Sequence, residues 1–216
     1  MIADDMGLGK TIQAIACAEL LSKELGIDKI LIVCPTSLKY QWQSEIQRFA
    51  GDAAIVVEGN AEEREKLYAG AEKYYIPSYN VTGADFKAIN KGDFDLLILD
   101  EAQRIKNWRT KTAASIKKIS TPYLTVLTGT PIENKLEELY SILQFVDPYK
   151  LGALFRFLSR HQITDEKGRV TGYKDLNVLG KSLSDVMIRR KRADVLSQLP
   201  ERSDKILYVP VTSEQM

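Results

Sequence analysis

The residues best suited to chemistry lie near the start of the chain, where positions 4–11 read Asp-Asp-Met-Gly-Leu-Gly-Lys-Thr. Glycines at positions 7 and 9 allow backbone N–H groups to turn inward around phosphate oxygens, and the helix predicted after them adds the positive end of its dipole. Lys10 supplies a point charge for the β- and γ-phosphates of a nucleotide, and the Thr11 hydroxyl is a ligand for Mg²⁺. The pattern predicts a phosphate-binding loop made of Met6, Gly7, Leu8, Gly9, Lys10 and Thr11.

This loop departs at one position from the usual phosphate-loop pattern G-x-x-x-x-G-K-[ST], because Asp4 stands where the first glycine is expected. The alternative interpretation is a glycine-rich turn that enters a helix and leaves Lys10 in solvent. Gly-Lys-Thr at the start of a helix is uncommon by chance, so we favour the phosphate site.

A second pair of candidate catalytic residues, Asp100 and Glu101, directly follows the apolar run at 94–99. Ligands of open α/β sheets bind beyond the carboxyl ends of the strands. There, Asp100 can hold hydrated Mg²⁺ and Glu101 can polarise an attacking water. Two acids after a strand could also begin a surface loop, but a phosphate loop predicted at the same edge of the sheet favours the catalytic pair.

Strands and helices alternate along the part of the chain that must position these residues. Short apolar runs rich in β-branched or aromatic residues predict buried strands at 30–34, 53–57, 74–76, 94–99 and 124–127. Helical patterns lie between them at about 11–25, 38–49, 62–69 and 110–119. The alternation predicts an α/β fold with a doubly wound, mostly parallel sheet and helices on both of its faces.

After Pro131 the pattern changes to a helical excursion. Amphipathic helices are predicted at 133–146, 151–160 and 176–192, and a turn-rich stretch at 164–172 precedes the last of them. A final apolar run at 206–211 predicts a strand that returns to the sheet.

Composition excludes several classes of protein. The chain has 216 residues, 44% of them hydrophobic and 27% charged, as in an ordinary folded domain. Two cysteines and one histidine exclude a disulfide framework and a four-ligand Cys/His zinc site. The sequence has no run of 18 apolar residues and no signal-peptide pattern, so we expect no membrane partner.

Charge is distributed unevenly along the chain. Residues 1–100 carry 10 Lys and Arg against 16 Asp and Glu, whereas residues 101–216 carry 20 against 13. A basic half can attract the phosphate backbone of a nucleic acid, although an ordinary solvated surface explains such an excess equally well.

Taken together, the motifs resemble those of the Swi/Snf-type family of helicase superfamily two, which contains double-stranded DNA translocases and chromatin remodellers. Residues 4–11 resemble motif I, which in that family also tolerates an acid in place of the first glycine. The other matches, in chain order, are 32–42 with motif Ia, 100–107 with motif II, 127–134 with motif III, and 187–192 with the end of the first ATPase lobe. The ordered matches cover essentially the whole chain.

The resemblance implies a RecA-like fold, ATP and Mg²⁺ as cofactors, and double-stranded DNA as a partner. It divides the chain into an ATP-binding core at 1–132, whose first strand is truncated, a helical excursion of the same lobe at 133–200, and a returning strand with the start of a linker at 201–216. A complete motor of this type has a second RecA-like lobe, which we expect to be absent here, and that lobe supplies arginine fingers. We therefore expect the isolated lobe to be nearly inactive.

Two other functions remain open at this point. One is a nucleotide- or DNA-binding module without turnover, and the other is the motor part of a restriction or repair translocase. The oligomeric state stays undetermined. The expected location is the cytoplasm or nucleoid of a prokaryote, which we favour, or the nucleus of a eukaryote.

The resemblance also suggests roles for residues outside the nucleotide site. Coupling between nucleotide and DNA is assigned to Gln103, Thr128, Gly129 and Thr130, with Gln103 standing where histidine is commoner; a simple strand-ending turn is the alternative at 128–130. Contacts to the DNA backbone are assigned to Ser37, Lys39, Ser78, Tyr79, Arg189 and Arg190. For the aromatic and basic members of this set, a core position or a solvated turn is the competing interpretation. Trp42 is interpreted as a core residue.

Overall fold

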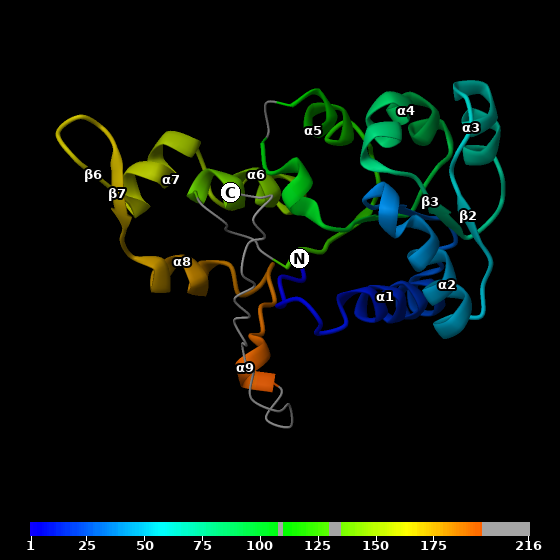
Figure 1. Ribbon diagram of the computed structural model, residues 1–216, viewed down its shortest axis with the longest axis horizontal. Helices are drawn as coiled ribbons and strands as arrows, with labels where there is room; N and C mark the ends of the chain where they lie inside the picture. Colours follow the sequence, from blue (N-terminus) through cyan, green and yellow to red (C-terminus); the bar gives the residue numbers. More distant parts are fainter. Residues whose placement is uncertain (108–109, 130–134, 196–216) are drawn as a thin grey trace, which may run out of the picture.

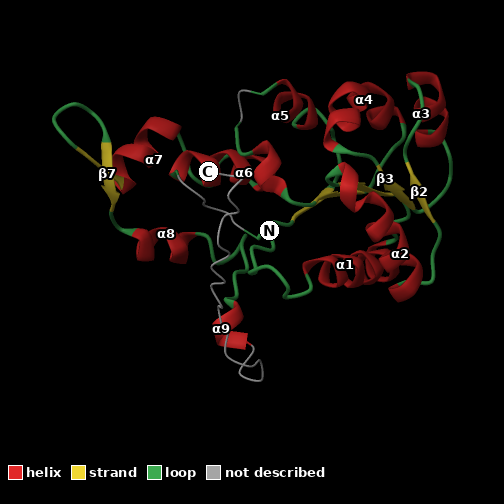
Figure 2. Cartoon of the chain, viewed as in Figure 1, coloured by secondary structure: helices red, strands yellow, loops and turns green. Residues whose placement is uncertain are grey.

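The computed structural model describes residues 1–107, 110–129 and 135–195. Its centre is a five-stranded parallel sheet with the strand order β2-β3-β1-β4-β5 (Figures 1 and 2). The strands are β1 (Ile30–Val33), β2 (Ala54–Val56), β3 (Tyr74–Ile76), β4 (Leu96–Leu99) and β5 (Tyr123–Val126). Each lies within an apolar run that the sequence predicts as a strand, apart from the first residue of β5.

Helices cover both faces of this sheet (Figure 1). On one face lie α1 (Lys10–Leu25) and α2 (Lys39–Phe49), and on the other lie α3 (Ala61–Tyr68), α4 (Tyr79–Lys91), α5 (Lys111–Ile116) and α6 (Leu136–Val146). In β1, Ile30 and Ile32 pack in one core cluster whereas Leu31 and Val33 pack in the other. A strand buried on both faces needs a continuous apolar run, which is why the sequence pattern is so clear.

Two further segments extend the sheet beside β5. Ile2 forms parallel bridges with Leu127 on one side and Ile188 on the other. The backbone N–H of Ile2 donates to Val126 at 2.8 Å, and that of Ala3 donates to Ile188 at 2.7 Å. Residues near the two ends of the described chain therefore lie side by side, directly before the predicted phosphate loop in the sequence.

The helix predicted at 176–192 is wrong in its second half. The helix α8 (Leu176–Ser182) ends there, and Ile188 is extended and paired with Ile2. The apolar run at 186–188 is short and fits a strand as well as a helix, so periodicity alone could not separate the two. The returning strand predicted at 206–211 lies outside the described residues.

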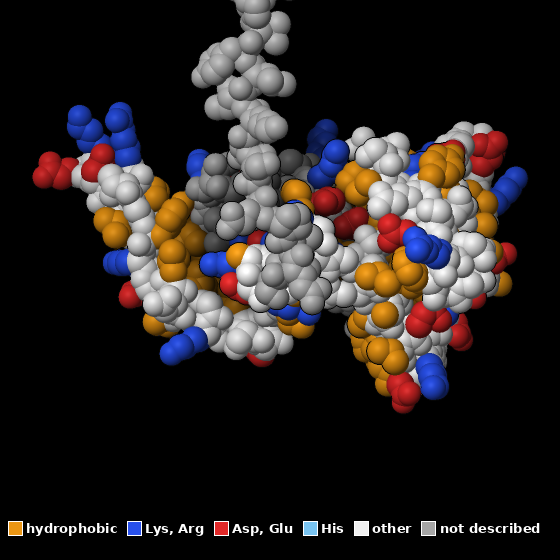
Figure 3. Space-filling model, turned by 60° about the horizontal axis from the view of Figure 1, so that its bottom comes forward, with side chains coloured by type: hydrophobic (Ala, Val, Ile, Leu, Met, Phe, Trp, Pro, Cys, Tyr) orange, Lys and Arg blue, Asp and Glu red, His pale blue; other side chains and the backbone are white. Residues whose placement is uncertain are grey.

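The helical excursion packs around a third core cluster, which joins α6 to α7 (Leu154–His161) and α8. The turn-rich stretch predicted at 164–172 contains the turn of an antiparallel hairpin, whose strands β6 (Gln162–Thr164) and β7 (Val170–Tyr173) take up its two ends. Figure 3 shows charged side chains at the tip of this hairpin and hydrophobic ones along the outside of the helical part. The shorter elements are η1 (Thr36–Leu38), η2 (Ala102–Ile105) and α9 (Arg192–Val195).

The predicted fold class, an α/β doubly wound parallel sheet followed by a helical excursion, is thus confirmed. The helix α4 is an addition that the sequence pattern did not predict. The division at residue 132 falls among residues that are not described, so the domain boundaries stay a prediction. Within the described ranges, no helix has the length and apolar character needed to cross a bilayer.

Candidate active site

The predicted phosphate loop and acidic pair meet at one pocket of about 530 Å³. It lies at the carboxyl end of β4, between the start of α1 and the side of α2. The pocket lining includes Met6, Gly7, Gly9, Lys10 and Thr11 from the loop together with Asp100 and Glu101. Leu8 is the one loop residue of the predicted set that does not line it.

The shape of the loop depends on its two glycines. Gly7 and Gly9 have φ values of 84° and 72°, in the left-handed region where a side chain is strained. Gly9 also caps α1 without a side chain, so no side-chain oxygen satisfies the first N–H groups of the helix there. Because α1 is 16 residues long and its N-terminus faces the pocket, this end of the helix is suited to bind an anion.

The Lys10 side chain folds back over the start of the loop. Its Nζ donates to the backbone carbonyl of Asp4 at 3.0 Å and to that of Asp5 at 3.3 Å. The ammonium group therefore stays at the wall of the pocket, where it can face a phosphate.

Asp100 is held from two sides and is only 6% exposed. Its Oδ2 accepts a hydrogen bond from the Trp42 indole N–H at 2.8 Å, and its Oδ1 accepts one from the Glu101 backbone N–H at 2.9 Å. The Tyr79 hydroxyl donates to the Asp100 backbone carbonyl at 2.7 Å. Burial raises the pKa of Asp100 above its usual value, although the Trp42 hydrogen bond opposes the shift.

Glu101 is linked through side chains to the segment that follows β5. The Gln103 amide donates to the Glu101 carboxylate, and the Thr128 hydroxyl donates to Gln103 Oε1 at 2.9 Å. Glu101 itself has a φ of 50°, an uncommon conformation for a residue with a side chain. The structure therefore links two of the predicted coupling residues to the acid predicted to orient water: Gln103 contacts Glu101 directly, and Thr128 contacts Gln103.

Gly129 lies against the other half of the site. A Cβ added to it would be 3.0 Å from Met6 Cγ and 3.5 Å from Lys10 Nζ. The segment after β5 thus contacts both the acid side and the phosphate side of the pocket. Thr130, the fourth predicted coupling residue, lies outside the described residues.

Comparison with known proteins identifies the chain. The sequence profile of the SNF2-related domain matches residues 1–216. The chain belongs to the SNF2-related domain family. It is 36% identical over 223 residues to the putative ATP-dependent helicase/translocase YwqA of Bacillus subtilis, a match that covers 99% of this chain and 24% of that protein. The resemblance to the Swi/Snf-type family is therefore confirmed.

Two further comparisons concern sequence and fold. The uncharacterized ATP-dependent helicase MG018 of Mycoplasma genitalium is 35% identical over 217 residues, which cover 99% of this chain and 20% of that protein. The solved SWI2/SNF2 ATPase core of Sulfolobus solfataricus in complex with double-stranded DNA matches with a TM-score of 0.75 and 33% identity over 92% of this chain and 42% of that one. The chain spans about a fifth to a quarter of the length of these curated relatives.

The SNF2-related domain offers oxygen ligands that fit Mg²⁺. The Thr11 hydroxyl and the Asp100 carboxylate come from different elements and line the same pocket. Within the described ranges, no group of three or more His, Cys, Asp or Glu residues could hold a metal ion by itself. This donor set suits Mg²⁺, which keeps several waters and takes phosphate oxygens as further ligands, better than a metal that needs a full protein cage.

The residues predicted to contact DNA lie in different surroundings in this domain. Ser37 is exposed in η1, whereas Lys39 is 5% exposed and its ammonium group pairs with Glu58. Ser78 and Tyr79 are both buried, and Tyr79 supports Asp100. A contact between these side chains and DNA stays a prediction, and Ser37 is the one of these four residues whose side chain is exposed.

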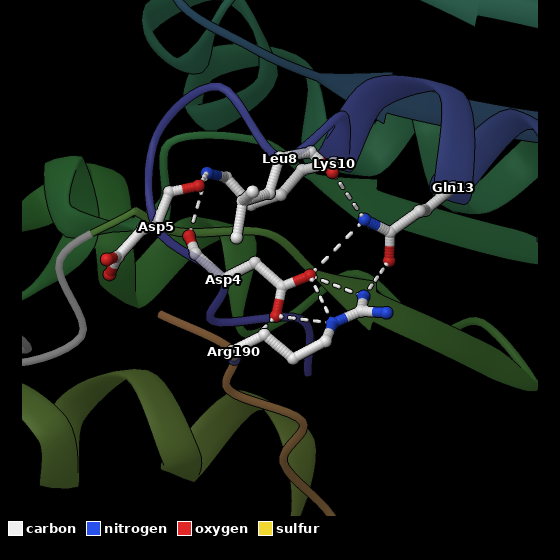
Figure 4. Close-up of polar contacts among 6 residues, drawn as sticks. All are labelled: Asp4, Asp5, Leu8, Lys10, Gln13 and Arg190. Atoms are coloured by element: carbon white, nitrogen blue, oxygen red, sulfur yellow. Dashed lines mark hydrogen bonds and ion pairs between the residues drawn. The ribbon is translucent and has the colours of Figure 1, made fainter. Parts of the chain in front are cut away.

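Arg189 and Arg190, the last two of the residues predicted to contact DNA, lie beside the phosphate loop. Arg189 approaches Asp5 at 3.8 Å, and the Arg190 guanidinium pairs with Asp4 (Figure 4). Gln13, in the first turn of α1, donates to the Asp4 carboxylate at 3.2 Å and to the Leu8 carbonyl at 2.9 Å. No sequence signal pointed to Gln13, to the role of Trp42, or to the pair between Arg190 and Asp4.

Proposed function

We propose that this SNF2-related domain binds and hydrolyses ATP as one lobe of a motor that moves along double-stranded DNA. The observation that carries the proposal is the meeting of Lys10, Thr11, Asp100 and Glu101 at one pocket. The names of the two helicase relatives support the use of ATP, and the DNA complex of the solved relative supports DNA as the track.

The reaction is the attack of a water molecule on the γ-phosphorus of ATP, with cleavage of the bond between the γ-phosphorus and the bridging oxygen, giving ADP and phosphate. Lys10 and the N–H groups at the start of α1 bind the phosphates. Thr11 and Asp100 would hold Mg²⁺, which would neutralise charge on the phosphates. Glu101 accepts a hydrogen bond from the attacking water and orients it.

The partners follow from the same resemblance. A second RecA-like lobe closes over the nucleotide and supplies the arginine that stabilises the transition state, a contribution of about 10³ to 10⁵ in rate in related phosphoryl-transfer enzymes. DNA is bound through its backbone, because the exposed Ser37 and the shielded Lys39 suit phosphates rather than base edges. The link from Glu101 through Gln103 to Thr128 passes the nucleotide state to these contacts.

The test is a comparison of binding and turnover in the full-length protein. Glu101→Gln keeps the shape of the side chain and removes the charge that orients water, so we expect Mg²⁺–ATP affinity to stay within about threefold while turnover falls by about 10² to 10⁴. Lys10→Ala removes a charge that faces the phosphates, so we expect it to weaken binding. Isothermal titration beside a phosphate-release assay measures both quantities.

The matched control is Glu45→Gln, an acid of α2 that lines the same pocket and has no assigned role. It should retain both affinity and turnover. Equal loss of affinity in Glu101→Gln and Lys10→Ala would contradict the assignment. ATP binding by the wild-type protein without any DNA-stimulated turnover would favour a binding module instead.

A further inference from the structure

The basic segment at 189–192 contacts Asp4 and Asp5, the two residues of motif I that precede the phosphate loop. The Asp5 backbone N–H donates to the Arg190 carbonyl at 3.1 Å, and the Arg192 backbone N–H donates to the Asp5 carboxylate at 3.0 Å. These contacts continue the pairing of Ile188 with Ile2. The segment is therefore tied to Asp4 and Asp5 and is not a free basic surface.

The centre of this pairing is Asp4, the acid that replaces the first glycine of the phosphate-loop pattern. Its side chain is 0% exposed. It accepts hydrogen bonds from the Arg190 backbone N–H at 2.8 Å, from Arg190 Nε at 3.0 Å, from Arg190 Nη2, and from Gln13 (Figure 4). A buried carboxylate needs such donors, and here one arginine supplies most of them.

The pKa of Asp4 reflects the same arrangement. Burial by itself raises it, but the hydrogen bonds from the Arg190 side chain and backbone and from Gln13 outweigh burial and leave the pKa below its usual value. Asp4 is therefore a charged carboxylate at neutral pH, and its charge is balanced by Arg190.

Asp4 is connected directly to Lys10. The backbone carbonyls that accept hydrogen bonds from Lys10 Nζ are those of Asp4 and Asp5, the two residues that the basic segment holds. Arg190 also donates to Gln13 Oε1, and Gln13 donates to the Leu8 carbonyl inside the loop. The side chain of Arg190 thus fixes the loop at its start and, through Gln13, at Leu8.

We propose that Arg190 is a positioning residue for the phosphate site: it neutralises the buried Asp4 carboxylate and so keeps Lys10 free to face a nucleotide phosphate. This inference rests on the proposed function. Without Arg190, the Asp4 carboxylate is an unpaired anion beside the loop that competes with the phosphates of ATP for the Lys10 ammonium group. The role is distinct from the DNA contact that the basic cluster suggests in the sequence.

The test measures the affinity of the full-length protein for Mg²⁺ with a fluorescent, non-hydrolysable ATP analogue, together with its melting temperature. We expect Arg190→Ala to weaken binding about tenfold or more, the size expected for loss of a charge-assisted hydrogen bond. Lys191→Ala, in the same segment and exposed, is the matched control and should bind within about twofold of wild type.

Two double variants separate positioning from a merely structural role. Asp4→Asn combined with Arg190→Ala removes the unpaired anion, so affinity should recover toward that of Asp4→Asn alone. In a Lys10→Ala background, Arg190→Ala should have little further effect on affinity, because the group it positions is already gone. If the double variant lost affinity by the product of the losses in Lys10→Ala and Arg190→Ala, the proposal would be overturned.

Other outcomes are equally decisive. A lower melting temperature with unchanged affinity in Arg190→Ala would make Arg190 structural only, and lost DNA affinity with unchanged ATP affinity would return it to DNA binding. If Arg190→Ala does not fold, Arg190→Lys replaces it: this variant keeps the charge but loses the two-pronged hydrogen bonding to Asp4, and it should bind the ATP analogue about threefold more weakly than wild type. An affinity of Arg190→Lys equal to that of Lys191→Ala would overturn the proposal. Unchanged affinity in Lys10→Ala would instead refute the proposed function.

Discussion

The phosphate loop and the acidic pair face the same pocket, but different kinds of contact hold them. On the loop side, the partner of the buried Asp4 is Arg190, whose side chain is 48% exposed and comes from the far end of the described chain. On the acid side, Asp100 is held by Trp42 and Tyr79, both of which are buried in the core between the sheet and its helices. The loop side is held by an ion pair with one exposed member, whereas the acid side is held by side chains packed in the core.

This difference predicts how each half responds to change. A charge pair with one exposed member can be broken without opening the core, provided that the buried Asp4 is neutralised as well, as in Asp4→Asn combined with Arg190→Ala. A side chain such as Trp42 fills volume as well as donating a hydrogen bond, so its loss costs folding free energy and alters the catalytic carboxylate together. Substitutions on the loop side should therefore separate affinity from stability, whereas those on the acid side should not.

The largest effect that tests this contrast is expected for Trp42→Phe. The change removes the N–H that contacts Asp100 and leaves unfilled volume, so the free energy of unfolding should fall by about 2–4 kcal/mol in urea denaturation. Because that N–H lowers the pKa of Asp100, its loss should raise this already elevated pKa further. The acid limb of the pH profile of kcat/KM should move to higher pH.

The sign of the pH effect on stability follows from the same shift. The pKa of Asp100 is higher in the folded protein than in the unfolded chain, so its contribution to stability decreases as the pH rises through that interval. Tyr79→Phe is the matched control, because its hydroxyl contacts the backbone of Asp100 and not the carboxylate. An unshifted acid limb in Trp42→Phe would show that the two halves are not held so differently.

The sequence predicts those parts of the site that depend on neighbouring residues, and it misses the contacts between residues that are far apart in the chain. Buried strands such as β1 and β4 are apolar at every position, because both faces of the sheet are covered, and a run of four to six such residues is visible in isolation. The loop and the acidic pair are also local patterns. By contrast, Asp4 and Arg190 are 186 positions apart, and Trp42 and Asp100 are 58 apart, so no local pattern reveals either pair.

The helix α4 was missed for a related reason. It contains Asn80, Thr82 and Gly83, which are poor helix formers in isolation. A Cβ on Gly83 would lie 3.4 Å from Thr112 Cα, so the glycine permits the close approach of α4 to α5. Tertiary packing thus outweighs local propensity here, and the sequence alone could not show which helix would pack against this one.

A smaller effect is expected for Gly129→Ala, at the point where the segment after β5 contacts the loop. The added methyl group would force the Met6 side chain to move by a few tenths of an ångström and would approach Lys10. Because Met6 is exposed and flexible, we expect Mg²⁺–ATP affinity to fall about threefold to tenfold, near the lower end of the cost of overpacking.

The control for this substitution is Gly180→Ala in α8, where an added Cβ meets no atom within 4 Å. It should leave affinity unchanged and stabilise the helix slightly. Titration with the fluorescent ATP analogue checks both variants. Equal affinity in the two would mean that the loop tolerates movement on this side, and only its pairing with Arg190 would then distinguish it from the acid side.

The smallest effect is expected on DNA binding and distinguishes Lys39 from Arg190, two basic residues that the sequence analysis assigned together to the DNA backbone. Lys39 pairs with Glu58, whose side chain is 50% exposed, whereas Arg190 pairs with the fully buried Asp4. Water can solvate Glu58 when its partner leaves, so Lys39 can exchange Glu58 for a DNA phosphate, whereas Arg190 would leave a buried charge behind. Of these two basic residues, we therefore expect Lys39 and not Arg190 to contribute to DNA binding.

The measurement is fluorescence anisotropy on two duplexes of unrelated sequence over a salt series. Lys39→Ala should make the slope of log affinity against log salt shallower by about one unit on both duplexes, because one phosphate contact is lost. Glu58→Gln should strengthen binding, since it releases Lys39, and Arg190→Ala should leave the slope unchanged. A shallower slope in Arg190→Ala would place that residue on DNA after all, and the loop side would then be held by a contact that DNA can compete for.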